Sequence, residues 1–266
     1  MRSYLKLLSL LLIPLVSVVI YAKTDAEIGV GEFVLEKATL PCDDDNDDYN
    51  DNDNDDDNYD FEPLTISTDT LTYNQPDTAT QRILFFGDSM LESLGRRFDQ
   101  YTTENGHELT SVIWYSSSTK LWATTDTLQH FIRTVKPTFV MICLGSNELS
   151  VRDLTKRDAY VKTILQRIGD LPYCWISPPN WKEDSGINKV ILDNVGKDHY
   201  FDSRHLVLER GSDNVHPTFS SGACWMDTVV MWMNSGAFPH PIRLNVPTEK
   251  RKRQFRQIIL APIRKS

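Results

Sequence analysis

Short apolar runs alternate with segments of helical periodicity from residue 81 to about residue 240. The clearest run, residues 139–144, is apolar at every position, as expected of a strand buried on both faces of a sheet. This alternation favours a parallel sheet with helices on both faces. Further strands are predicted at residues 82–86, 109–115, 173–177 and 199–202. Helices are predicted directly after Ser89 and at residues 128–135, 160–168, 187–195 and 220–233.

Polar residues follow four of the predicted strands at the point where each strand ends. In open parallel sheets, binding sites form at the carboxyl ends of the strands. We therefore expect four loops to converge on one edge of the sheet. They contain Ser89, residues 116–119, residues 145–148 and residues 178–180.

Ser89 is the candidate nucleophile, and a downstream Asp–His pair is the candidate activating system. A serine hydroxyl attacks poorly unless a neighbouring base takes its proton. Asp213 precedes His216 by three residues, which suits an imidazole base held by a carboxylate. Each residue also has a simpler interpretation: Ser89 as a helix N-cap, His216 as a surface histidine, and Asp213 as a turn former.

Asn147 is the candidate for stabilising negative charge in a transition state. It follows the apolar run 139–144 through Gly145, so its side-chain amide is expected at the same edge as Ser89. A fixed amide donor at that place suits an oxyanion hole. The alternative is an asparagine that only forms a local turn.

Three short motifs together resemble the blocks of the SGNH (GDSL-type) hydrolase superfamily. They are Gly87-Asp88-Ser89, Gly145-Ser146-Asn147-Glu148 and Asp213-Asn214-Val215-His216, in the family's order within residues 81–235. The resemblance implies a three-layer α/β/α flavodoxin-like domain with a central parallel sheet. It also implies a Ser89–His216–Asp213 triad, an oxyanion hole that includes Ser89 and Asn147, and no metal or organic cofactor.

The chain departs from the family pattern at two places. Glu148 stands where the family commonly has aspartate, which we interpret as a change behind the site. The second block normally supplies a glycine N–H to the oxyanion hole, whereas residues 116–120 read Ser-Ser-Ser-Thr-Lys. We assign that backbone donor to Thr119, and expect its β-branched side chain to alter the shape of the hole.

The charge of the chain is concentrated in one acidic tract. Residues 43–60 contain eleven of the acidic residues and no basic one, and the rest of the chain has 28 basic and 26 acidic residues. No basic field of the kind that nucleic acids require is present. We expect residues 23–80 to be a polar linker whose acidic tract, 42–60, is a solvated spacer. The tract lacks the glycine and glutamate of a high-affinity calcium loop.

Residues 1–22 combine a basic start with an apolar stretch, which predicts a secretory leader. The domain is then exported to the periplasm, the cell surface or the medium. The alternative that an uncleaved leader tethers it to the membrane remains open. The basic tail, 243–266, has two interpretations. It contacts anionic lipid or wall polymer, or it packs back on the domain.

The chain has four cysteines: Cys42, Cys143, Cys174 and Cys224. Cys143 and Cys174 lie in apolar runs, where a thiol behaves as a small hydrophobic side chain. We expect no disulfide, and the spacing gives no metal site.

The sequence thus predicts a hydrolase domain at residues 81–242 that acts as an exported serine esterase. The resemblance is greatest to exported carbohydrate esterases, notably the peptidoglycan O-acetylesterases of Gram-negative bacteria. The expected partner is an acylated carbohydrate or cell-wall polymer. Two alternatives remain: an O-acyltransferase that uses the same residues, and a non-catalytic glycan- or wall-binding protein on the same fold.

Overall fold

The computed structural model describes residues 28–30, 33–35, 74–248 and 256–262. The chain divides into two compact units, 1–61 and 62–266, which are described separately. In the first unit, β1 (Ile28–Val30) and β2 (Phe33–Leu35) pair as an antiparallel hairpin. The predicted leader and the acidic tract lie outside the described residues.

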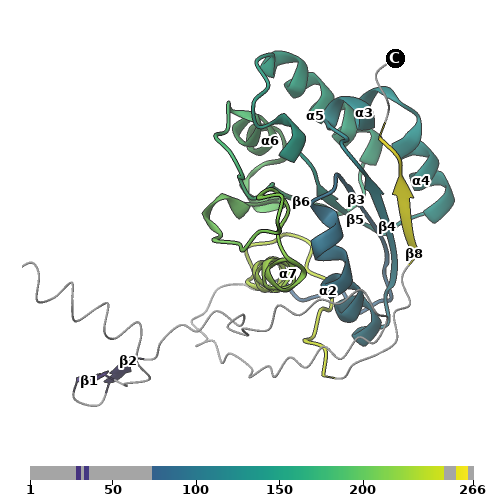
Figure 1. Ribbon diagram of the computed structural model, residues 1–266. Helices are drawn as coiled ribbons and strands as arrows, with labels where there is room; N and C mark the ends of the chain where they lie inside the picture. The colour runs from purple at the N-terminus through teal and green to yellow at the C-terminus, as the bar shows by residue number, and fades with distance from the viewer. Residues whose placement is uncertain (1–27, 31–32, 36–73, 249–255, 263–266) are drawn as a thin grey trace, which may run out of the picture. The chain divides into compact units, whose positions relative to one another are not determined.

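The second unit is built on one parallel sheet of six strands (Figure 1). The strand order is β7-β6-β5-β3-β4-β8, in which the first five strands follow the flavodoxin-like order and β8 is added at an edge. Their bounds are β3 (Arg82–Gly87), β4 (Glu108–Trp114), β5 (Phe139–Cys143), β6 (Tyr173–Ile176), β7 (Tyr200–Phe201) and β8 (Arg256–Leu260).

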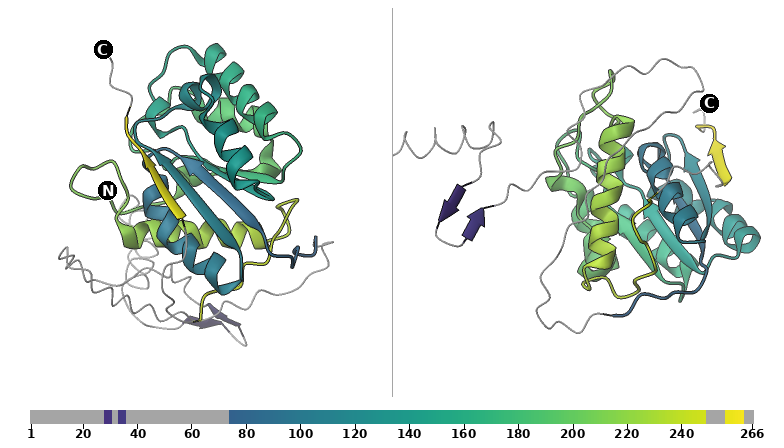
Figure 2. Two further views of the ribbon diagram at one scale, coloured as in Figure 1. Left: turned by 90° about the vertical axis from the view of Figure 1, so that its right-hand side faces the viewer. Right: turned by 90° about the horizontal axis from the view of Figure 1, so that it is seen from below.

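Helices cover both faces of this sheet and complete three layers (Figure 2). On one face, α2 (Leu91–Glu104) packs against α7 (Phe219–Asn234). The other face is covered by α3 (Thr119–Thr124), α4 (Thr127–Val135), α5 (Leu154–Ile168) and α6 (Ile187–Val195). Three short 3₁₀ helices complete the unit: η1 (Ser146–Glu148), η2 (Lys197–His199) and η3 (Ser203–His205).

The central strand β3 explains why both layers form. Its side chains alternate between the two faces: Ile83 and Phe85 join the core under α2 and α7, and Leu84 and Phe86 join the opposite core. All four are fully buried. A strand buried on both faces reads as a continuous apolar run, so the sequence signal and the packing have the same cause.

The predicted strands and helices within residues 81–240 are confirmed, with ends that shift by a few residues. The hairpin of β1 and β2, the three 3₁₀ helices, α3 and β8 were not predicted. Helix α3 lies partly in residues expected to form a loop, and β8 lies in the basic tail. Residues 256–260 therefore pack back as a strand parallel to β4, which is the second of the two interpretations of the tail.

The expectation that no disulfide forms is wrong, because Cys224 is disulfide-bonded. Cys143 and Cys174 are free and buried, as their apolar surroundings predicted. That argument did not apply to Cys224, which is only partly buried on α7. The remaining cysteine, Cys42, lies outside the described residues. Among the described helices, none is both long and apolar enough to cross a membrane.

Candidate active site

Ser89 lies in the sharp turn between the buried strand β3 and helix α2. Gly87, at the end of β3, approaches the neighbouring strand β5 very closely, since a Cβ there would lie 1.9 Å from the Cys143 carbonyl oxygen. The next residue, Asp88, donates its backbone N–H to that same oxygen at 3.1 Å. The N-cap of α2 is Met90, and no side chain caps this helix, so Ser89 does not serve as the cap.

Asp88 fixes the turn from inside the protein. Its fully buried carboxylate accepts the Met90 N–H at 3.0 Å through Oδ1 and the Ser146 N–H at 3.2 Å through Oδ2. Burial raises the pKa of Asp88 to about 7, although the two backbone N–H groups favour its charged form. The loops after β3 and β5 are therefore held together beneath Ser89.

The structure brings Ser89, His216 and Asp213 together in one hydrogen-bonded chain. His216 Nε2 lies 2.8 Å from Ser89 Oγ, and His216 Nδ1 lies 2.5 Å from Asp213 Oδ2. Because an ionised carboxylate only accepts, Nδ1 carries the proton, and Nε2 is then the acceptor for the Ser89 hydroxyl. This is the arrangement in which an imidazole can take a serine proton.

Asp213 also organises its own loop. Its Oδ1 accepts the N–H groups of Val215 at 2.9 Å and His216 at 3.0 Å. The turn-forming role considered from sequence is thus real, but the second oxygen remains available for His216. Hydrogen bonds from the His216 side chain and these two N–H groups hold the pKa of Asp213 well below its usual range. The carboxylate therefore stays ionised at neutral pH.

Asn147 lies on η1, just after Gly145, whose φ of 127° is in the region that favours glycine. Its Nδ2 donates to the Ser117 carbonyl oxygen at 2.9 Å, across the loops that follow β5 and β4. This contact spans thirty residues, so Asn147 does not merely form a local turn. One amide hydrogen is engaged and fixes the side chain, and the second is left for another acceptor.

The assignment of Thr119 to the oxyanion hole is wrong. Its backbone N–H donates to Glu148 Oε2 at 2.8 Å, and its hydroxyl donates to Glu148 Oε1 at 2.8 Å. Thr119 is fully buried, so no substrate oxygen competes for that N–H. Among the described hydrogen bonds, the N–H groups of Ser89 and Ser118 have no protein acceptor, so both are candidate backbone donors in the loops after β3 and β4.

Glu148 and the glycine-free loop, the two places where the chain departs from the family pattern, are therefore hydrogen-bonded to each other through Thr119. Glu148 is 1% exposed in its side chain and also pairs with Arg157 Nε at 2.7 Å. The sequence presented Glu148 and the glycine-free loop as unrelated features, and gave no signal for Arg157. Trp122 is fully buried beside this loop, and its indole N–H donates to Ser117 Oγ at 3.0 Å.

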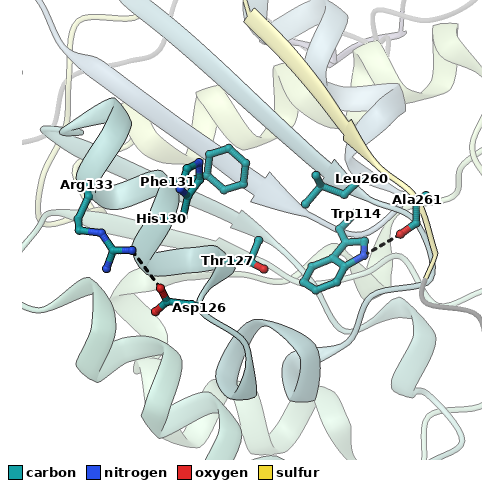
Figure 3. A pocket seen from close by; sticks show the side chains of 8 residues that line it. All are labelled: Trp114, Asp126, Thr127, His130, Phe131, Arg133, Leu260 and Ala261. Carbon is teal, nitrogen blue, oxygen red and sulfur yellow. Dashed lines mark hydrogen bonds and ion pairs between the residues drawn. The ribbon is translucent and has the colours of Figure 1, made fainter.

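A cavity of about 640 Å³ lies elsewhere, between α4 and the ends of β4 and β8 (Figure 3). Its floor includes Trp114 and Phe131, which are both almost fully buried, and its rim includes the exposed pair Arg133–Asp126. None of the Ser89, His216 and Asp213 side chains lines it. Within the described residues, no group of three or more His, Cys, Asp or Glu side chains is placed to hold a metal ion.

Comparison with known proteins adds little to this geometry. No protein-family model and no curated protein matches the chain. One solved structure that it resembles is "BT4096 a gut microbial diltiazem-metabolizing enzyme", with 13% sequence identity and a TM-score of 0.37. The match covers 59% of this chain and 48% of that one.

Proposed function

We propose that this chain is an exported serine esterase of the SGNH type that removes acetyl or other short acyl groups from carbohydrate. The observation that carries the proposal is the hydrogen-bonded chain Asp213–His216–Ser89 at the carboxyl edge of the sheet. The order of the three sequence motifs supports the family, and the leader in residues 1–22 supports export. Peptidoglycan is the candidate polymer because the motifs resemble those of peptidoglycan O-acetylesterases.

The proposed reaction begins with attack of Ser89 Oγ on the ester carbonyl carbon, while His216 Nε2 takes the hydroxyl proton. The oxyanion of the tetrahedral intermediate accepts hydrogen bonds from the Ser89 N–H and the second Asn147 amide hydrogen. The Ser118 N–H is the candidate third donor. Asp213 stabilises the imidazolium through Nδ1.

Collapse of this intermediate breaks the bond to the alcohol, and His216 gives its proton to the departing oxygen. A water molecule then attacks the acyl-enzyme, and its proton passes to His216. Collapse of the second intermediate releases the carboxylic acid and returns the proton to Ser89. The side chains of His216 and Asp213 are 43% and 49% exposed. Such access favours water as the acceptor over a sugar hydroxyl, and hence hydrolysis over acyl transfer.

The proposal is tested by acetate release from O-acetylated peptidoglycan and from acetylated xylan, with p-nitrophenyl acetate as a general ester. The wild-type domain is expected to hydrolyse the general ester, and Ser89→Ala is expected to abolish turnover. Equal rates in the two proteins would contradict the nucleophile assignment. Product that appears only when a sugar acceptor is added would indicate a transferase. Tight glycan binding without any turnover would indicate a binding protein.

A further inference from the structure

Most backbone hydrogen bonds of the loop that carries Asp213 and His216 join residues within the loop. The N–H of Gly211 donates to the His216 carbonyl at 2.9 Å, and the N–H of Asn214 donates to the Gly211 carbonyl at 2.9 Å. Asn214 has a φ of 57°, which sharpens the turn. These bonds fix the shape of the loop, but they do not fix where the loop lies relative to Ser89.

Two features attach this loop to the rest of the domain: an apolar contact of Val215 and the start of helix α7 at Thr218. The Val215 side chain packs partly against the core under α2 and α7. Thr218 begins α7 as its N-cap, and its hydroxyl accepts the Ser221 N–H at 3.2 Å. Apolar packing is not directional. A directional contact from outside the loop is therefore needed to hold the Asp213–His216 pair in a fixed direction relative to Ser89.

Arg210 makes such a contact between two loops. Its Nη1 donates to the carbonyl oxygen of Val215, which lies in the chain between Asp213 and His216. Its Nη2 donates to the carbonyl oxygens of Pro179 and Asn180, each at 3.3 Å, in the loop after β6. The Arg210 guanidinium thus links the loop that carries His216 to the loop that follows β6.

The loop that receives Arg210 is itself anchored in the core. The Asn180 side-chain oxygen accepts Asn188 Nδ2 at 2.9 Å. Asn188 is fully buried on α6, and its own oxygen accepts the Tyr200 hydroxyl at 3.1 Å. The chain of contacts therefore runs from the His216 loop through Arg210 and Asn180 to α6 and β7.

We propose that Arg210 is a positioning residue that sets the His216 imidazole against Ser89, and this proposal rests on the proposed function. Arginine suits the role because its planar guanidinium presents several donors in a fixed fork, whereas lysine offers a mobile point charge. The described hydrogen bonds of Arg210 go to backbone carbonyl oxygens, and none goes to the Ser89 or His216 side chain. Arg210 acts through the Val215 carbonyl and therefore through the direction of His216.

The test compares Arg210→Ala and Arg210→Lys with Arg204→Ala. Arg204 is a matched control, because it lies six residues upstream and pairs only with Asp202 among the contacts that the structure describes. Each variant is assayed for kcat and KM on p-nitrophenyl acetate. Each is also examined by NMR for the His216 Nδ1 proton and by thermal unfolding.

We expect Arg210→Ala to lower kcat by about 10- to 100-fold with KM changed less than about twofold, since a displacement of about 1 Å can cost that much. Its His216 Nδ1 proton signal is expected to broaden or shift, whereas Arg204→Ala is expected to match the wild type in both readouts. Arg210→Lys is expected to fall between them. It also replaces Arg210→Ala in the comparison if the alanine variant does not fold.

Wild-type kcat and an unchanged His216 signal in the Arg210 variants would overturn the proposal, and so would equal losses in the Arg204→Ala control. The NMR readout separates this proposal from the proposed function. If the wild type hydrolyses no ester, the function fails. The Nδ1 signal of Arg210→Ala compared with that of the wild type still decides whether Arg210 positions His216.

Discussion

The two halves of the candidate site are built in opposite ways. The half that carries Ser89 is buried, with Gly87 pressed against Cys143 and the Asp88 carboxylate closed inside the protein. The half that carries Asp213 and His216 is an exposed loop in which both side chains are nearly half accessible. This difference implies that changes in the first half cost stability, whereas changes in the second cost activity and leave the fold intact.

The largest expected effect tests the exposed half. His216→Ala is expected to lower kcat by about 10⁴-fold or more, because triad members act as a unit. Asp213→Asn is expected to cost about 10⁴-fold, because it favours the wrong imidazole tautomer. The free energy of unfolding, measured with urea, is expected to change by less than about 0.5 kcal/mol in His216→Ala, as at other exposed sites. A large loss of stability in His216→Ala would contradict the proposed difference between the buried and exposed halves of the site.

Gly87→Ala tests the buried half. The new Cβ would lie 1.9 Å from the Cys143 carbonyl oxygen, so β3 or β5 must move. We expect the free energy of unfolding to fall by about 4 kcal/mol or more. The control is Gly95→Ala in α2, where a Cβ would meet its nearest neighbours at 3.7 Å and would improve helix propensity. The two substitutions are expected to have opposite signs in the same denaturation assay.

Glu148→Gln tests whether the buried contacts of Glu148 with Thr119 and Arg157 stabilise the fold. The substitution removes the partner of Arg157 and weakens the bonds from Thr119. We expect a loss of about 3 kcal/mol in the free energy of unfolding, as for a broken buried ion pair. Arg133→Ala, which breaks an exposed pair with Asp126, is the control and is expected to cost less than about 1 kcal/mol. Equal costs would contradict the account of Glu148.

The two halves are also expected to differ in the sign of their pH dependence. The pKa of Asp88 is raised to about 7, so between about pH 4 and pH 7 the unfolded chain has lost a proton that the folded protein keeps. Stability should therefore fall as the pH rises through this range, by up to about 4 kcal/mol. The pKa of Asp213 is lowered, so its contribution is present above its unfolded pKa and is lost as the pH falls through its folded pKa.

Asp88→Asn separates the two contributions. Urea denaturation at a series of pH values is expected to show a flatter profile between pH 4 and pH 7 in this variant than in the wild type. The decline at acidic pH is expected to persist, because Asp213 is unchanged. An identical slope in both proteins between pH 4 and pH 7 would show that Asp88 does not titrate as proposed.

The sequence predicted the central architecture because the strongest signals are local. A strand buried on both faces, such as β5, is apolar at every position. In contrast, α3 has only six residues, and β8 is an exposed edge strand with two partly buried side chains, so neither has a clear period. Its parallel pairing with β4 depends on a partner almost 150 residues away in the chain.

The candidate site shows the same limit. Ser89, Asp213, His216 and Asn147 were found because motif order and strand ends are visible in sequence. Thr119 was misassigned because its N–H binds Glu148, a partner 29 residues away that no spacing rule connects to it. Arg210 was missed for the same reason, since its acceptors are backbone carbonyls of residues that any sequence could supply.

The central claim is that Ser89 accepts an acyl group when His216 takes its proton. The most direct measurement is intact-mass and peptide-mass analysis of the protein quenched rapidly after mixing with p-nitrophenyl acetate. We expect a mass increase of one acetyl group, located on Ser89, in the wild type and none in His216→Ala. Turnover with the acetyl group on another residue, or labelling of Ser89 that does not depend on His216, would contradict the account.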